Sequence, residues 1–302
     1  MDSYKQYIQQ ILPDLPIYSY KQNENGWDNV AVIINEALLF RFPRKSEYAK
    51  RIPLEKELCA ILAQSLQATE VPNYHLLYTN DSDSVPFCSY YTLIHGDPLT
   101  AETVAKLERK EREIIITQLA TFLATLHSIP IKCAEQLGFI IEKTITYWKH
   151  LQSKLYHYLS HSFTLLERQA VRNLFHNFFE LMHDPNLENT VIHADFTHHH
   201  ILFDEKSKAI SGIIDFGDAQ IGDPALDFAG LYYDFGNEFT KAVYKQYCAL
   251  IPHRDPLFTR RITDFYQYSP LLHNLIYSFE TNNEREIKKD RESLRAILQG
   301  LN

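Results

Sequence analysis

The chain of 302 residues contains four cysteines, and no two of them are close together in the sequence. Because there is no CxxC pair, the sequence indicates neither a zinc ribbon nor a disulfide framework, and we expect reduced thiols. No apolar run approaches the roughly 18 residues that a membrane-spanning helix needs. Residues 1–13 lack the pattern of a signal peptide. These absences predict a cytoplasmic protein with no membrane partner.

An excess of basic residues is also absent, since 30 Lys and Arg residues face 38 Asp and Glu residues. The formal net charge of −8 argues against a nucleic-acid partner, which requires a basic surface for the phosphate backbone. An acidic chain is better suited to a cationic or a small neutral ligand. With 45% hydrophobic residues the composition is that of a folded chain, and the length fits two domains or one large one.

The first third of the chain is rich in predicted strands. A turn signal, Asn25-Gly26, precedes them, and Pro53 opens a predicted helix with leucines at helical spacing. The expected strands are residues 30–34, 38–42, 74–78 and 89–94. The breaker sequence His95-Gly-Asp-Pro98 follows, so we predict a β-rich domain over residues 1–95.

The remaining residues, 96–302, have mainly helical periodicity. One predicted hairpin interrupts the helices, with strands at 201–204 and 210–214. The expected helical stretches are residues 101–127, two helices between 147 and 183, and the chain after Pro224. We therefore predict an α+β fold with a small β-rich domain and a larger, mainly helical domain.

Two acidic loops flank the predicted hairpin. Asp195 lies before its first strand, and Asp215 follows its second strand in the sequence Asp215-Phe-Gly217. Since both loops lie at the same end of the hairpin, the two carboxylates can face a common cleft. Such a pair suits phosphoryl transfer, in which one carboxylate orients the attacking hydroxyl and the other binds magnesium. The order also follows the protein-kinase pattern HRDxxxxN…DFG, with His200 in the position of the Asn.

Two other interpretations remain open at this stage. The first is a metal hydrolase built on His198, His199 and His200, although adjacent residues point in different directions and seldom bind one ion. The second is a non-catalytic nucleotide-binding module, favoured by Arg41 and His200 at positions where kinases have Lys and Asn. The intact Asp195 and Asp215 argue against it.

Several further motifs accompany the two loops. They are Gly26–Asn29, Leu39–Pro43, Leu123–His127, Ile192–Phe196, Ile201–Asp204, Gly212–Ala219 and Asp223–Ala229. As a set, they resemble the aminoglycoside phosphotransferase family over nearly the whole chain, and His200 is similar to the 2''-type aminoglycoside kinases. The resemblance implies a bilobal protein-kinase-like fold, with residues 1–95 as the nucleotide-binding N-lobe and residues 96–302 as the helical C-lobe.

The resemblance also implies roles for the residues around the hairpin. Asp195 is expected to be the catalytic base, and His200 and Asp215 the ligands of Mg²⁺. Histidine is a softer ligand than asparagine, whereas Mg²⁺ prefers oxygen, so the His200 position could tolerate Mn²⁺ better. Asp227 resembles a structural aspartate that braces the catalytic loop from the following helix.

On the nucleotide side, the resemblance places Arg41 where the family usually has a lysine that contacts phosphate. Arginine keeps the charge but not the shape of lysine. We expect Glu57 to be its ion-pair partner, with Glu55 as the alternative. Asn29 and its neighbours are expected to contact phosphate, and the backbone of the hinge at Thr92 and Ile94 to pair with the purine. ATP and GTP remain equally open.

The expected acceptor is an aminoglycoside, with a macrolide, an amino alcohol or a sugar as alternatives. Asp234 and Glu238 lie one helical turn apart just beyond the metal loop, so both can face one pocket for a cationic acceptor. The neighbouring Tyr232 and Tyr233 either pack in the interior or stack against the acceptor. We expect a monomer.

Overall fold

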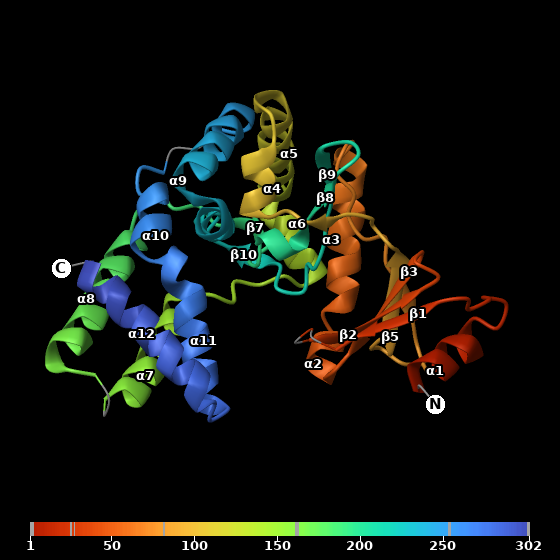
Figure 1. Cartoon of the computed structure of the whole chain (residues 1–302), viewed down its shortest axis with the longest axis horizontal. Helices are drawn as coiled ribbons and strands as arrows, with labels where there is room; N and C mark the ends of the chain where they lie inside the picture. Colours follow the sequence, from red (N-terminus) through yellow and green to blue (C-terminus); the bar gives the residue numbers. More distant parts are fainter. Residues whose placement is uncertain are drawn as a thin grey trace.

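The computed structural model describes residues 3–24, 26, 28–80, 82–160, 163–252 and 255–300. Asn25, from the predicted turn, and Trp27, from the predicted nucleotide loop, lie outside these residues. The chain forms two parts, a β-rich one that contains the N-terminus and a mainly helical one that contains the C-terminus (Figure 1).

The strands are β1 Tyr20–Asn23, β2 Asn29–Ile34, β3 Leu38–Pro43, β4 His75–Leu77, β5 Cys88–Thr92, β6 Asp97–Pro98, β7 Thr190–Ile192, β8 Ile201–Asp204, β9 Ala209–Ile213 and β10 Gln220–Gly222. The helices are α1 Ser3–Ile11, α2 Ser46–Ala49, α3 Ile52–Ser65, α4 Ala101–Lys106, α5 Arg109–His127, α6 Ile131–Leu137, α7 Ile145–Leu159, α8 Leu165–Leu181, α9 Ala225–Leu250, α10 Phe258–Asp264, α11 Ser269–Glu280 and α12 Glu284–Gly300.

The β-rich part is an antiparallel sheet with the strand order β1-β2-β3-β5-β4. The predicted hairpin of β2 and β3 is confirmed, and its turn at Asn35 and Glu36 has φ angles of 56° and 53°. This left-handed geometry matches the twist of a tight hairpin, and asparagine tolerates it. The Asn35 side chain also accepts hydrogen bonds from the backbone N–H groups of Tyr18 and Ser19, which fixes the incoming chain.

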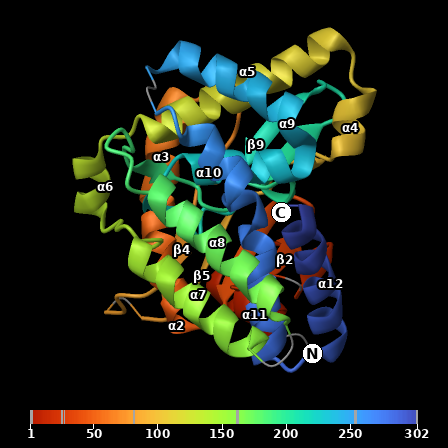
Figure 2. The ribbon, with the colours of Figure 1, turned by 90° about the vertical axis from the view of Figure 1, so that its left-hand side faces the viewer.

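The helical part contains the predicted catalytic hairpin, β8 and β9, with β6 paired to its outer edge. A second pair, β7 with β10, was not predicted, because each strand has only three residues. The helix expected over residues 101–127 is two helices, since the chain breaks at Leu107 and a capping box at Glu108 starts α5. Helices α7, α8, α11 and α12 lie side by side at the C-terminal end (Figure 2).

The two parts share buried apolar contacts. Leu58 and Leu62 of α3 and Tyr91 of β5 belong to the same core as the helices that follow. Helix α1 and buried residues of β2 and β3 form a smaller cluster of their own. Helix α3 therefore lies between the sheet and the helical part and packs against both. The domain boundary near His95 stays a prediction.

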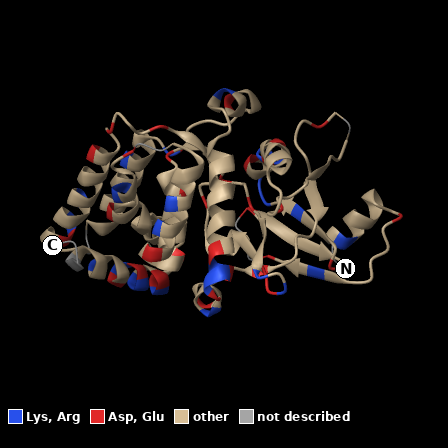
Figure 3. Ribbon diagram, turned by 90° about the horizontal axis from the view of Figure 1, so that it is seen from above, with Lys and Arg blue, Asp and Glu red and all other residues tan. Residues whose placement is uncertain are grey.

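Basic and acidic residues alternate along both parts of the ribbon (Figure 3). None of the described helices is, taken singly, long and apolar enough to cross a membrane. Helices α5 and α6 pass that test only as a pair bent by 71°.

Candidate active site

A cleft of about 660 Å³ lies between the sheet and the catalytic hairpin. Strands β2 and β3 line one wall with Ala31, Leu39 and Arg41, and the opposite wall holds Asp195 and the loop that starts at Asp215. The prediction that the two carboxylates face a common cleft is confirmed. Among the described lining residues there are four carboxylates and one arginine, so the cleft favours a cation.

The loop that carries Asp195 is held from beneath by a buried carboxylate. Asp227, at the start of α9, accepts hydrogen bonds from the backbone N–H groups of His193 (2.9 Å) and Ala194 (2.8 Å). Its third contact is the imidazole of His127, 3.0 Å away. Burial alone would raise the pKa of Asp227. The hydrogen bond from His127 and the charges of the nearby histidines lower the pKa by more than burial raises it, so the carboxylate stays charged. The predicted brace is confirmed.

The geometry at Ala194 explains why this brace is needed. Ala194 has φ 65°, a left-handed conformation that costs free energy for a residue with a Cβ atom. Two charge-assisted hydrogen bonds to Asp227 stabilise that conformation. The turn leaves the side chain of Asp195 44% exposed at the surface of the cleft.

The two loops are joined across the hairpin by His193. Its Nε2 atom lies 3.0 Å from the carbonyl oxygen of Ile214, and since a carbonyl only accepts, Nε2 carries the proton. Burial lowers the pKa of His193, which favours the neutral ring. Asp215, the next residue, has φ 63° and presents its carboxylate to the cleft.

His200 lies between the carboxylates of Asp195 and Asp215. Its Nδ1 atom is 2.9 Å from the backbone oxygen of Asp195, so Nδ1 donates and Nε2 keeps a lone pair. Nε2 lies 3.6 Å from Oδ2 of Asp215. A ring nitrogen and a carboxylate oxygen therefore point at the same space. Among the described residues, however, no group of three or more His, Cys, Asp or Glu could hold a metal without further ligands.

Arg41 reaches the cleft from the middle of β3, where it is nearly buried. Its Nη1 atom donates to Oε2 of Glu55 at 2.5 Å and lies 2.6 Å from the hydroxyl of Tyr74. Its Nη2 atom is 3.1 Å from Asp215. Burial opposes the charge on Arg41, but Glu55, Tyr74 and Asp215 raise its pKa above the usual range, so it stays positive.

The prediction that Glu57 is the ion-pair partner of Arg41 is wrong, and the alternative, Glu55, is the partner. Glu55 is buried on the face of α3 that packs on the sheet, whereas Glu57 is exposed to solvent. The signal was present in the sequence, since Glu55 lies three residues before Leu58 and seven before Leu62, on the same helical stripe.

The predicted nucleotide contacts are only partly brought together. Asn29 lines the cleft, and its Oδ1 atom is buried without a hydrogen-bond partner among the described residues. At the hinge, Tyr91 lines the cleft, while Thr92 and Ile94 are not part of its lining. The backbone N–H of Leu93 donates to the carbonyl of Ala37, in the turn before β3. Backbone groups alternate along a strand, so Thr92 presents its own to the opposite side.

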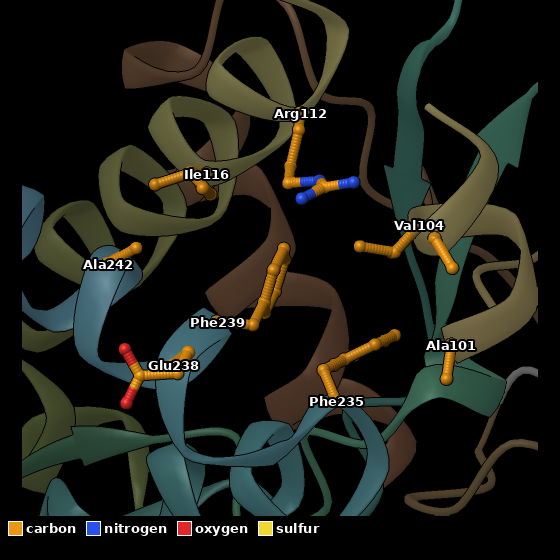
Figure 4. Close-up of a pocket in the computed structure, with 9 residues that line it drawn as sticks. Ala101, Val104, Arg112, Ile116, Phe235, Glu238, Phe239 and Ala242 are labelled. Atoms are coloured by element: carbon orange, nitrogen blue, oxygen red, sulfur yellow. The ribbon is translucent and has the colours of Figure 1, made fainter. Parts of the chain in front are cut away.

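Asp234 and Glu238 do not face one pocket, because α9 is broken between them. Gly236 has φ 80° and ψ 177°, which is not helical. Asp234 lies under the catalytic loop, where it accepts from the backbone N–H of His198 at 2.8 Å. Glu238 instead lines a separate cavity of about 540 Å³, opposite Arg112 and beside Phe239 (Figure 4). A regular helix was assumed, and the glycine that ends it was overlooked.

The three consecutive histidines diverge, as expected for neighbours in a short turn. His198 pairs with Asp234, the ring of His199 packs against that of His198 at a tilt of 37° with centroids 3.8 Å apart, and His200 faces the cleft. They do not form the ligand set that a metal hydrolase would require.

Three polar residues of the cleft were not predicted. Asp28 and Asp218 line it, and in both cases burial raises the pKa, with nearby carboxylates raising it further. Arg51, at the start of α3, reaches the loop after Asp215. No sequence pattern marks Arg51, because its partners in that loop are more than 160 residues away.

The chain matches the model of the phosphotransferase enzyme family over residues 19–257. Among solved structures it is similar to the GDP complex of aminoglycoside 2'-phosphotransferase-IIIa, with a TM-score of 0.83, 22% identity and coverage of 99% of this chain and 98% of that one. It is also similar to the streptomycin-ATP-APH(2")-IIa ternary complex, with a TM-score of 0.75, 22% identity and coverage of 98% and 97%.

A third similar structure is macrolide 2'-phosphotransferase type I, with a TM-score of 0.70, 20% identity and coverage of 97% of this chain and 96% of that one. At these identities the similarity shows the fold. The predicted fold, with a small β-rich part and a larger helical part, is thereby confirmed as kinase-like.

Proposed function

Because the chain belongs to the phosphotransferase enzyme family, we propose that it transfers the γ-phosphoryl group of ATP or GTP to a hydroxyl group of an aminoglycoside. The observation that carries the proposal is the meeting of Asp195, His200 and Asp215 in one cleft, with Arg41 opposite them. The neighbours support the substrate classes, since those complexes contain GDP, ATP or streptomycin.

Several polar groups at the cleft have a part in this reaction. Asp195 accepts a hydrogen bond from the acceptor hydroxyl and directs its oxygen toward the γ-phosphorus. Arg41 contacts the nucleotide phosphates, and Glu55 and Tyr74 hold its guanidinium in place. Asn29 donates to a phosphate oxygen, and the backbone at Thr92 and Ile94 pairs with the purine.

His200 and Asp215 are the residues that would hold Mg²⁺. The lone pair on Nε2 and the charged Asp215 fit a divalent cation, because Arg41 lowers the pKa of Asp215 against the effect of burial. Two protein ligands suffice, since Mg²⁺ usually keeps waters and phosphate oxygens as its other ligands. When bound, the ion would neutralise phosphate charge in a cleft that is otherwise rich in carboxylates.

The metal roles are tested by titrating nucleotide binding with magnesium. Asp215→Ala should remove the magnesium dependence, and His200→Ala should weaken it less, because Asp215 supplies the oxygen ligand. His199→Ala is the matched control, since its ring faces His198 and not the cleft. An Asp215→Ala variant with the wild-type magnesium dependence would reject Asp215 as a ligand. Repeating the titration with Mn²⁺ tests the softer ligand, His200.

The acceptor is proposed to be cationic because of the acidic cleft. Asp218 lies near Asp195 on the helical side of the cleft, and we assign it the role that Asp234 and Glu238 do not fill. Asp218→Asn should raise the acceptor KM about fivefold, the size of a partly exposed ion pair of about 1 kcal/mol. Glu238→Gln, whose carboxylate points into the other cavity, should leave it unchanged.

A nucleotide-consumption screen decides the acceptor. Aminoglycosides, macrolides and small alcohols are compared with ATP and with GTP as donor. Turnover with an aminoglycoside that weakens as salt is added supports the proposal, because salt screens charge pairs. Turnover of macrolides or of uncharged alcohols alone would keep the phosphotransferase and remove the aminoglycoside. Nucleotide binding without any turnover would support the non-catalytic module.

A further inference from the structure

Arg51 connects the β-rich part of the chain to the loop that follows Asp215. The residue precedes the first turn of α3, and its guanidinium contacts the backbone of that loop. Nε donates to the carbonyl oxygen of Gly217 at 2.5 Å, and Nη2 donates to that of Ala219 at 2.6 Å. The remaining nitrogen, Nη1, pairs with Glu142. One planar side chain thus binds two carbonyls of the loop and a carboxylate outside it.

The carbonyls that Arg51 binds belong to a tight turn. The backbone N–H of Ala219 donates to the carbonyl of Phe216 at 3.1 Å, so Phe216–Ala219 forms a turn directly after Asp215. Asp215 has φ 63°, and a non-glycine residue keeps such an angle only when its surroundings enforce it. Phe216, fully buried, and Gly217, bound by Arg51, both follow the strained residue, while Ile214 on its other side is bound by His193.

The far end of the loop is held from the helical part. The N–H of Ile221 donates to the carbonyl of Ile140, and the N–H of Lys143 donates to Oε1 of Gln220. Glu142, which lies in this same segment, is the residue that pairs with Nη1 of Arg51. The loop is therefore bound by Arg51 from the β-rich part and by residues 140–143 from the helical part.

We propose that Arg51 is a positioning residue that keeps the loop after Asp215 in the conformation that binds the cation of the nucleotide. This inference rests on the proposed function only in assigning Asp215 to that cation. Arg41 also contacts this loop, but it binds the side-chain carboxylate of Asp215, and in the proposed reaction its guanidinium binds phosphate. Arg51 binds backbone carbonyls of the loop, so its contacts can stay in place when a nucleotide binds.

The test compares Arg51→Gln and Arg51→Lys with the wild type in the full chain. Each protein is titrated with ATP and with GTP, without Mg²⁺ and across a magnesium series, and its unfolding midpoint is measured. We expect the magnesium concentration for half-maximal nucleotide binding to rise about tenfold in Arg51→Gln, the usual effect of removing a group that orients a metal ligand. Affinity without Mg²⁺ should stay unchanged. Arg51→Lys keeps the charge but not the planar, forked set of donors, so its half-maximal magnesium concentration should lie between those of the wild type and Arg51→Gln.

Two further variants separate positioning from ordinary stabilisation. Arg168→Gln is the matched control, because Arg168 also donates to a backbone carbonyl, that of Ser160, far from the cleft. It should change the unfolding midpoint at most and leave the magnesium series as in the wild type. Glu142→Gln leaves both carbonyl contacts of Arg51 in place, so its magnesium shift should be smaller than that of Arg51→Gln.

A wild-type magnesium series in both Arg51 variants would overturn the inference, whatever happens to their midpoints. If Arg51→Gln does not fold, Arg51→Lys decides, and a wild-type magnesium series in it overturns the inference. The proposed function fails separately, when the wild type transfers no phosphoryl group to any acceptor. The binding series still tests Arg51 in that event.

Discussion

The loop of Asp195 and the loop of Asp215 meet in one cleft, yet they are supported from different parts of the chain. Asp227 and His127, which hold the loop of Asp195, both come from helices of the C-terminal part. Arg41 and Arg51 reach the loop of Asp215 from the sheet and from the start of α3. The loop of Asp195 is thus held within one part, while the loop of Asp215 depends on contacts between the two.

This difference separates two kinds of effect. Damage to the support of Asp195 removes a buried charge network, and it should affect stability and turnover together. Damage to the support of Asp215 changes a partly exposed loop at the junction, and it should affect nucleotide and metal binding more than stability. One site can thus combine a half that is supported from within one part with a half that is supported from both.

The largest expected effect is that of Asp195→Asn. The change should reduce the rate of phosphoryl transfer by about 10²–10⁴, the usual contribution of a general base, and leave nucleotide affinity unchanged. Steady-state rates and a nucleotide titration measure the two quantities. A variant that keeps more than about a tenth of the activity would contradict the assignment of Asp195.

Next in size is Asp227→Asn, which tests the support of the loop of Asp195. It should lower the free energy of unfolding by about 3–5 kcal/mol. The reason is that two backbone N–H groups and His127 lose the buried negative charge that they contact. Denaturant unfolding at neutral pH measures the loss. Asp234→Asn is the control on the same helix, with a smaller expected cost of about 1–3 kcal/mol.

The pH dependence of the Asp227→Asn effect has a defined sign. Because the folded pKa of Asp227 is lowered, its stabilisation is fully present above the ordinary carboxyl pKa near 3.9 and is lost as the pH falls toward the folded value. The difference between wild type and variant should therefore shrink in acid. A difference that grows in acid would exclude Asp227 as the charged brace.

A smaller effect is expected at the junction, where Glu55→Gln and Glu57→Gln form a matched pair on one helix. Glu55→Gln should weaken nucleotide binding by about 1.5–3 kcal/mol, since Arg41 loses a charged hydrogen-bond partner. Glu57→Gln should have no effect, because its side chain is exposed. Nucleotide titrations of both variants give the answer, and equal losses would refute the pairing seen here.

The smallest expected effect is a gain in stability from Asp28→Asn. Burial and the nearby Asp218 and Asp215 raise the pKa of Asp28, so the charged form destabilises the folded state at neutral pH. Asparagine should raise the unfolding midpoint by about 2 °C without metal. The gain should vanish as the pH falls through the raised pKa, where wild-type Asp28 takes up a proton. A loss of stability at neutral pH would contradict this.

Much of the fold and of the catalytic hairpin could be predicted from local sequence. Asp195, His200 and Asp215 lie within 21 residues on one β-hairpin, whose geometry follows from its own turn, so their spacing was sufficient to place them together. Strands β2, β3, β4 and β5 of the sheet were found in the same way, from short apolar runs between turn signals, whereas β1, which is polar, was missed. Shorter elements, such as β7 and β10, have too few residues to show a period.

Contacts between distant segments depended on the packing of the parts. Whether Glu55 or Glu57 meets Arg41 is set by the face of α3 that lies on the sheet, and hence by burial. Arg51 and Gly217 are 166 residues apart, and no local pattern pairs them. At Gly236 the chain leaves the helical conformation and turns Glu238 away from Asp234. Local hydrogen bonds and periodicity act over a few residues, whereas these choices follow from which surfaces exclude water when the whole chain folds.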